Sequence, residues 1–128
     1  MWKPVKGNIM TKWAEEIDID NVLPGYPRPQ MVRGEWLNLN GLWDYAIRKM
    51  GKAEFSKYDG KILVPFPLES ALSGVKKPLK PEETLWYRRT FTIPSDWQGQ
   101  RILLHFGAVD WKTNVWVNGQ HVGEHTGG

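Results

Sequence analysis

Cysteine is absent from this chain of 128 residues. Its absence excludes disulfide bonds, thiolate metal sites and a cysteine nucleophile, and it leaves the cellular compartment undecided. Long apolar runs are also missing: none approaches the roughly 20 residues that a membrane-spanning helix needs. Lys3 and Lys6 are not followed by the apolar stretch of a secretion signal. We therefore expect no membrane partner and no secretion signal in the sequence as it stands.

Concentrated positive charge is missing as well, although the formal net charge is +3. The densest basic clusters are the pairs Lys76-Lys77 and Arg88-Arg89. A protein that binds a polyanion usually gathers its lysines and arginines on one face or stripe. The composition thus indicates a mildly basic surface, and we expect no nucleic-acid partner.

Recognisable catalytic and metal-binding groups are scarce. Glycoside hydrolysis usually needs two carboxylates that flank the scissile bond, roughly 5–5.5 Å apart in retaining enzymes, whereas the neighbours in Glu15-Glu16 and Glu82-Glu83 would point to opposite faces of a strand. We interpret both pairs as solvated surface charge. The chain also has neither a glycine-rich phosphate loop nor a serine-nucleophile motif. We predict no catalytic residue and no cofactor.

Histidines give the same result for metals. His121 and His125 have the spacing that brings two ligands together on a helix. They fall on a predicted strand, however, where four residues span about 13 Å. A shared metal site is therefore not expected.

Aromatic residues are what the chain has in abundance, with 8 Trp, 4 Tyr and 4 Phe. These bulky side chains favour burial, and most of them fall in strand phase, which indicates one hydrophobic core. Trp111 differs, because it follows Asp110 in an expected turn. An exposed indole face beside a carboxylate can contact a sugar, so Asp110 and Trp111 are candidate carbohydrate-binding residues.

The N-terminal residues 1–35 read as an arm. A short helix is predicted within residues 10–19, with Thr11 as its N-cap. Three prolines between residues 24 and 29 predict an extended segment, in which Tyr26 can anchor the arm on a domain surface.

From Trp36 onward the pattern predicts β structure. Strands are expected over residues 42–48, 61–64, 85–93 and 101–106, and the second should stop at Pro65 because proline cannot donate to a ladder. Residues 65–81 contain four prolines and predict a long loop, a feature that is often functional.

Asn118-Gly119 is the strongest local signal, since this pair favours a type I′ hairpin turn. A two-residue loop predicts three pairs: Val117 with Gln120, Trp116 with His121, and Val115 with Val122. Several short strands with little helix predict an all-β sandwich or barrel.

A series of motifs in this order resembles glycoside hydrolase family 2. They are Leu39-Asn40-Gly41-Leu42-Trp43, Val64-Pro65-Phe66 with Glu69-Ser70, Leu85-Trp86-Tyr87-Arg88-Arg89 with Phe91, Leu104-His105-Phe106-Gly107-Ala108-Val109-Asp110, Val115-Trp116-Val117-Asn118-Gly119, and Val122-Gly123-Glu124-His125-Thr126-Gly127-Gly128. The resemblance covers about residues 23–128 and is to the N-terminal sugar-binding domain of β-galactosidases and β-glucuronidases.

The resemblance implies a galactose-binding-like jelly-roll β-sandwich over residues 36–128. In the family, further strands follow the final Gly-Gly, so we expect a partial jelly roll that is incomplete at the C-terminus. The resemblance also implies a retaining parent enzyme whose catalytic glutamates lie in a TIM barrel outside this sequence. Glu69, in the 65–81 loop, becomes a candidate rim residue of the active site, with a structural role as the alternative.

Three functions remain open. The leading one is a non-catalytic accessory domain that packs on the other domains of a β-glycosidase, whose substrate is a β-glycoside or oligosaccharide. The second is an independent carbohydrate-binding module. The third is an interaction fragment that associates, for example as a homo-oligomer, through an uncovered sheet edge.

Overall fold

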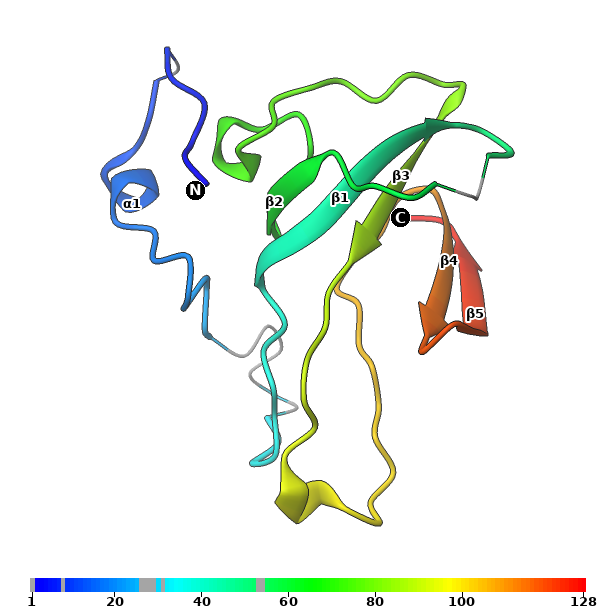
Figure 1. Cartoon of the computed structure of the whole chain (residues 1–128). Helices are drawn as coiled ribbons and strands as arrows, with labels where there is room; N and C mark the ends of the chain where they lie inside the picture. Colours follow the sequence, from blue (N-terminus) through cyan, green and yellow to red (C-terminus); the bar gives the residue numbers. More distant parts are fainter. Residues whose placement is uncertain (1, 8, 26–29, 31, 53–54) are drawn as a thin grey trace. The chain divides into compact units, whose positions relative to one another are not determined.

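The computed structural model describes residues 2–7, 9–25, 30, 32–52 and 55–128. The chain divides into two compact units, Met1–Thr92 and Ile93–Gly128, each with its own antiparallel sheet. Figure 1 shows these strands and the one α-helix of the described residues. The all-β prediction is confirmed, and the antiparallel sheets agree with the jelly-roll β-sandwich class. Within these ranges no helix is long and apolar enough to cross a membrane.

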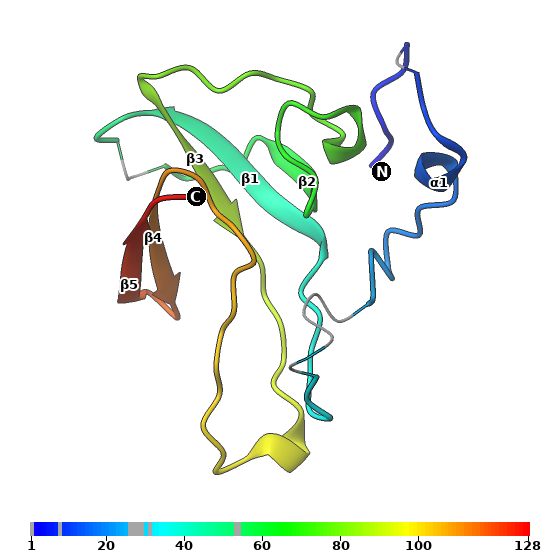
Figure 2. The same ribbon diagram turned by 180° about the vertical axis from the view of Figure 1, so that it is seen from behind.

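The first unit contains a three-stranded sheet in the order β2-β1-β3, and Figure 2 shows β1 between its two partners. The central strand β1 spans Gly41–Lys49, β2 spans Gly60–Val64 and β3 spans Glu83–Arg88. The strand predicted over 42–48 is confirmed. So is the end of β2 at Val64, directly before Pro65.

The core of the first unit lies where β2 pairs with β1. Ile62 pairs with Trp43 and Leu63 pairs with Leu42, and both β2 side chains are 0% exposed. Because successive strand residues point to opposite faces, both faces of the sheet are covered at this position. Ala46 of β1 is fully buried as well.

The family motifs of the first unit meet around one carbonyl group. The Leu39 carbonyl accepts from Trp43 Nε1 at 2.8 Å and from Arg89 Nη1 at 2.8 Å, and Arg89 Nη1 also donates to the Asn40 carbonyl at 2.7 Å. Gly41 makes this approach possible, since its φ is +123° and a Cβ there would lie 2.9 Å from Arg89 Nη1. These residues join the entry of β1 to the segment after β3.

Two asparagines hold the N-terminal arm to the same motif. Asn38 Nδ2 donates to the Val22 and Leu23 carbonyls at 3.3 Å, and Asn40 Nδ2 donates to the Val22 carbonyl at 3.3 Å. Val22 is 3% exposed, so the arm contributes to the core.

The predicted helix of the arm is confirmed but short. The helix α1 spans Lys12–Glu15, and Thr11 caps it by accepting from the Ala14 N–H at 3.3 Å. The predicted anchor Tyr26 and the last three residues of the proline-rich segment lie outside the described residues.

The second unit is built on a hairpin. Strand β4 spans Lys112–Val117 and β5 spans Gln120–Thr126. Asn118 and Gly119 have φ values of +51° and +79°, as a type I′ turn requires. The predicted pairs next to the turn, Val117 with Gln120 and Trp116 with His121, are confirmed.

The third predicted pair of the hairpin is wrong. Val115 pairs with Gly123, because a β-bulge between Val115 and Trp116 shifts the register by one residue. Val122 is left without a ladder partner and is 58% exposed. Val117 is also exposed, to 40%, so neither side chain is part of a closed core.

Two other strand predictions need correction. The strand predicted over 85–93 ends at Arg88, because the ladder with β1 ends at the pair of Asp44 and Arg88. Residues 101–106 form no strand, and Leu104 is 40% exposed. The alternation of apolar and polar residues predicts a strand, but a strand also needs a neighbouring strand as a hydrogen-bonding partner. In the described structure no strand pairs with residues 101–106. A short 3-10 helix, η3, spans Ser95–Trp97.

Candidate carbohydrate-contact site

Asp110 and Trp111 lie in the second unit, directly before β4. Both side chains are exposed, Trp111 to 67%. Their backbone is held on both sides: the Gly127 N–H donates to the Trp111 carbonyl at 2.8 Å, and Thr113 Oγ1 donates to the Val109 carbonyl at 3.2 Å. A fixed backbone thus presents an exposed indole next to an exposed carboxylate.

A shallow hollow of about 530 Å³ adjoins this pair. Val109 and Thr113, which flank Asp110-Trp111 in the sequence, both line it. Asp110 also lies near its edge, since a Cβ built on the lining residue Gly128 would be 3.7 Å from Asp110 Oδ1. The remaining lining residues come from one segment and from both hairpin strands: Leu104, Phe106, Gly107, Ala108, Val115, Val122, Gly123, Glu124 and His125.

Sequence reasoning missed Thr113 and His125, which the register brings together. They are opposite one another only because of the bulge, since an unbroken two-residue hairpin would pair Thr113 with Glu124. Gly123 was the available signal, because an isolated glycine in a strand pattern indicates a bulge. Together these residues add a hydroxyl and an imidazole to the apolar lining of the hollow.

Trp116 and His121 form a separate pair near the turn. Their ring centroids are 5.3 Å apart with an interplanar angle of 61°, and His121 Nε2 lies 3.1 Å from Asn114 Oδ1. This cross-strand contact stabilises the hairpin, which gives Trp116 a structural explanation.

Glu69 lies in the first unit and is exposed, in the turn before the 3-10 helix η2 (Ala71–Ser73). Its charge reaches Tyr87 of β3: burial raises the pKa of the Tyr87 hydroxyl, and the Glu69 carboxylate raises it further. The rings of Tyr87 and Trp43 also form a T-shaped pair, with centroids 6.4 Å apart. The carboxylate of the expected loop over 65–81 thus acts electrostatically on one tyrosine of the sheet.

The three predicted contact residues do not belong to one unit. Asp110 and Trp111 are adjacent in the second, whereas Glu69 belongs to the first. Among the residues with described positions, no group of three or more His, Asp or Glu is arranged to hold a metal ion. Glu83 has a local role, because its Oε2 accepts from the Lys80 N–H at 3.1 Å.

Comparison with known families gives the chain its assignment. The family model described as "Glycosyl hydrolases family 2, sugar binding domain" matches residues 23–128. The chain belongs to this family. The resemblance predicted over about residues 23–128 is therefore confirmed. The hydrogen bonds of Arg89 to the Leu39 and Asn40 carbonyls, beside Gly41, lie within the matched region.

The relatives that match this chain are much longer than the matched segment. A β-glucuronidase of Paenibacillus borealis is 27% identical over 109 residues, and one of Canis lupus familiaris is 31% identical over 118 residues. Each alignment covers 80% of this chain and 18% of the relative. A β-galactosidase of Thermoanaerobacter pseudethanolicus is 42% identical over 43 residues, 34% of this chain and 6% of the relative. The chain thus spans less than a fifth of the length of these relatives.

Proposed function

We propose that the chain is a non-catalytic accessory domain of an enzyme that hydrolyses β-linked sugars such as glucuronides or galactosides. One observation carries this proposal: the sugar binding domain of family 2 matches residues 23–128 of the chain. The names of the relatives, β-glucuronidase and β-galactosidase, support the substrate class. In this role the domain packs on a TIM-barrel catalytic domain and forms one wall of its substrate pocket.

The proposed contact residues have side chains that suit a sugar. The Trp111 indole offers an apolar face to the C–H groups of a sugar ring, and the Asp110 carboxylate accepts hydrogen bonds from hydroxyl groups. Glu69 offers a second carboxylate on the loop of the first unit. The arrangement binds and orients a glycan, while bond cleavage is assigned to the catalytic domain.

A direct test uses the purified 128-residue chain with chromogenic β-glucuronides and β-galactosides. We expect no turnover, and reproducible hydrolysis would overturn the accessory role. Circular dichroism on the same sample must show a folded β protein, so that inactivity is measured on the native chain.

A second candidate is an independent carbohydrate-binding module. The 67% exposure of Trp111 next to the hollow of the second unit favours it. Isothermal titration with β-linked oligosaccharides separates the two functions. Binding by the isolated chain that is lost in Trp111→Ala supports the module, and no heat with any glycan supports the accessory domain.

A third candidate is association between copies. In the described second unit, β4 and β5 pair only with each other, so each has an unpaired edge that can accept another strand. Light scattering at high concentration tests this, and a monomer throughout would exclude a homo-oligomer.

We also propose the domain limits 1–35 for the arm and 36–128 for the partial jelly roll.

A further inference from the structure

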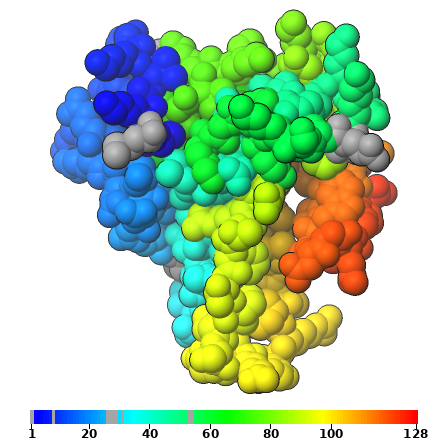
Figure 3. Space-filling view, viewed as in Figure 1, coloured from blue at the N-terminus to red at the C-terminus, as the bar shows by residue number. Residues whose placement is uncertain are grey.

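The first residues of the chain lie outside the region that matches the family, yet they dock on the loop that carries Glu69. Trp2 Nε1 donates to the Ser73 carbonyl at 3.0 Å, and the Val5 N–H donates to the Ala71 carbonyl at 3.0 Å. Figure 3 shows the dark blue N-terminal residues against the green surface of this part of the chain. Two hydrogen bonds therefore tie the start of the chain to η2.

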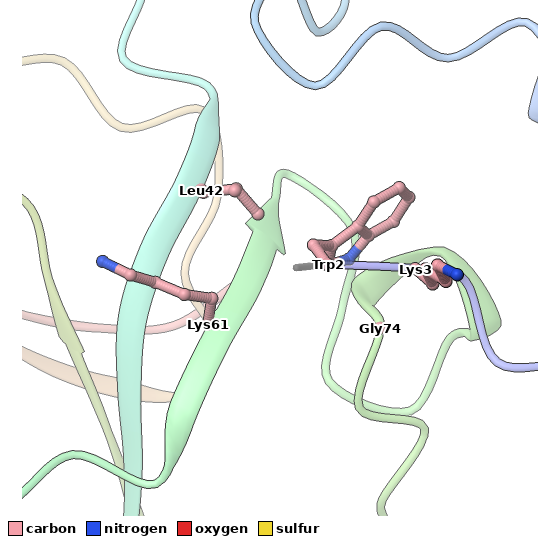
Figure 4. Close-up of a pocket in the computed structure, with 5 residues that line it drawn as sticks. All are labelled: Trp2, Lys3, Leu42, Lys61 and Gly74. Atoms are coloured by element: carbon pink, nitrogen blue, oxygen red, sulfur yellow. The ribbon is translucent and has the colours of Figure 1, made fainter.

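Gly74 is shaped to receive the indole of Trp2. Its φ is +82°, and a Cβ there would lie 2.5 Å from Cδ1 of Trp2, closer still to Nε1, and 3.2 Å from the Lys3 carbonyl oxygen. Any side chain at this position would have to displace the indole. Figure 4 shows Trp2 beside Gly74, with Leu42 of β1 on the other side of a hollow of about 440 Å³. The indole thus lies between the loop and the sheet.

The loop that receives the arm is itself held by a buried serine. Ser73 is 0% exposed, and its Oγ donates to the Ser70 carbonyl at 2.8 Å. The same Oγ accepts from the Val75 N–H at 3.0 Å and from the Lys76 N–H at 3.3 Å. The carbonyl of this serine is the acceptor for Trp2, so the arm binds a point of the loop that is itself held by hydrogen bonds.

From these contacts we infer that residues 2–5 form a clasp that fixes the conformation of the 65–81 loop, and that Trp2 is its positioning residue. The docking stands on the contacts of the first unit alone. Its consequence for a glycan, a fixed position of Glu69, rests on the proposed function. The two claims therefore have separate tests.

Hydrogen exchange of the 128-residue chain tests the docking. In Trp2→Ala, the amides of Gly74 and Lys77, which donate to the Ala71 and Leu68 carbonyls, should exchange roughly tenfold faster. Trp2→Phe keeps an aromatic ring but lacks the N–H donor, so it should give a smaller increase. Trp13→Ala is the matched control, because Trp13 is 67% exposed, and it should leave both amides unchanged.

The β1–β2 amides report whether the effect is local. They should keep their exchange rates in every variant. Unchanged exchange at Gly74 and Lys77 in Trp2→Ala would overturn the clasp. An equal rise at the β1–β2 amides would also overturn it, since Trp2 would then act on overall stability and not on the loop.

Gly74→Ala combined with Trp2→Ala gives an independent readout. In the presence of Trp2, the added methyl group meets the indole as well as the unfavourable φ. Without the indole only the backbone cost remains, so Gly74→Ala should accelerate loop exchange several-fold less in the Trp2→Ala background. Equal effects in both backgrounds would contradict the inference. If Gly74→Ala does not fold, the comparison of Trp2→Ala with Trp13→Ala decides alone.

The glycan claim is tested with Glu69→Gln. In an enzyme that joins this chain to its proposed catalytic domain, Trp2→Ala and Glu69→Gln should both raise KM with little change in kcat. If neither variant changes KM, the proposed role of Glu69 is wrong. The hydrogen-exchange test of the clasp is independent of that outcome.

Discussion

The two units of this chain differ in where their apolar side chains lie. In the first, Ile62, Leu63 and Ala46 are fully buried around a three-stranded sheet. In the second, whose residues are all described, no side chain reaches full burial, and both Trp111, directly before the two-stranded hairpin, and Val122, within it, are exposed. An isolated two-stranded hairpin is only marginally stable in water. Fully buried apolar side chains are confined, among the described residues, to the first unit, and the second unit has exposed apolar side chains.

The family motifs also differ between the two units. Gly41 and Arg89 join segments of the first unit through hydrogen bonds to main-chain carbonyls. The motif that ends at Asp110 leads instead to the exposed pair of the second unit. Family-typical residues are thus structural in one unit and candidates for contact in the other.

Core truncation should give the largest contrast between the units. Leu63→Ala removes a side chain that is 0% exposed and should lower the free energy of unfolding by about 3 kcal/mol. Leu103→Ala is the matched change in the second unit, where the side chain is 52% exposed, and it should cost less than about 0.5 kcal/mol. Urea denaturation measures both, and equal costs would refute the division.

Glycine substitution should give the next largest effect. Gly41→Ala places a methyl group 2.9 Å from Arg89 Nη1 at a φ of +123°, and we expect a loss of about 2 kcal/mol. Gly99→Ala in the second unit has a φ of +81° with open space around the methyl group, so only the backbone cost of about 1 kcal/mol applies. The midpoint temperature of thermal unfolding should be lower for Gly41→Ala than for Gly99→Ala. The reverse order would contradict the close approach of Arg89 to Gly41.

Acid should weaken the first unit through Asp59. The hydrogen bond from the Ile47 N–H lowers the pKa of this carboxyl most, and Arg48, with Nη1 2.8 Å from Oδ1, lowers it further. Because the pKa is lower in the folded than in the unfolded chain, the stabilisation is complete above the unfolded value of about 3.9 and is lost as pH falls through the folded value. Because the ion pair of Asp59 and Arg48 is partly exposed, its contribution to the free energy of unfolding is about 1 kcal/mol or less.

Asp59→Asn tests this by urea denaturation between pH 6 and pH 3. The variant should be less stable at pH 6, and its difference from the wild type should shrink as the pH falls. Asp96→Asn, an exposed carboxylate of the second unit, serves as the control. A difference for Asp59→Asn that stays constant with pH would refute the assignment.

Removal of the exposed indole should have the smallest effect on stability. Trp111→Ala should change the free energy of unfolding by less than about 0.5 kcal/mol, because the side chain is 67% exposed. In an assembled enzyme it should nevertheless raise KM for a β-glycoside. A large loss of stability without a KM effect would show Trp111 to be structural.

The sequence predicted most reliably what local rules determine. Thr11 as a cap, Val64 as a strand end and Asn118-Gly119 as a turn each follow from the chemistry of one or two residues. Residues 101–106 were mispredicted because their alternation contains no information about a neighbouring strand. The bulge at Val115 was missed because it depends on how two strands adjust to one another.

The candidate site was only partly accessible from the sequence. Asp110 and Trp111 were proposed from an exposed turn, and they are exposed in the structure. His125 was not proposed, because its position opposite Thr113 depends on the bulge. The docking of Trp2 on Gly74 joins residues 72 positions apart, which no local pattern predicts.

The accessory role is tested most directly by exchange of domains. The matched segment of the Paenibacillus borealis β-glucuronidase is replaced by this chain, and hydrolysis of a chromogenic β-glucuronide is measured beside a variant that lacks the segment. We expect that the chimaera folds and that its kcat/KM clearly exceeds that of the deletion variant. A folded chimaera no more active than the deletion variant would contradict it.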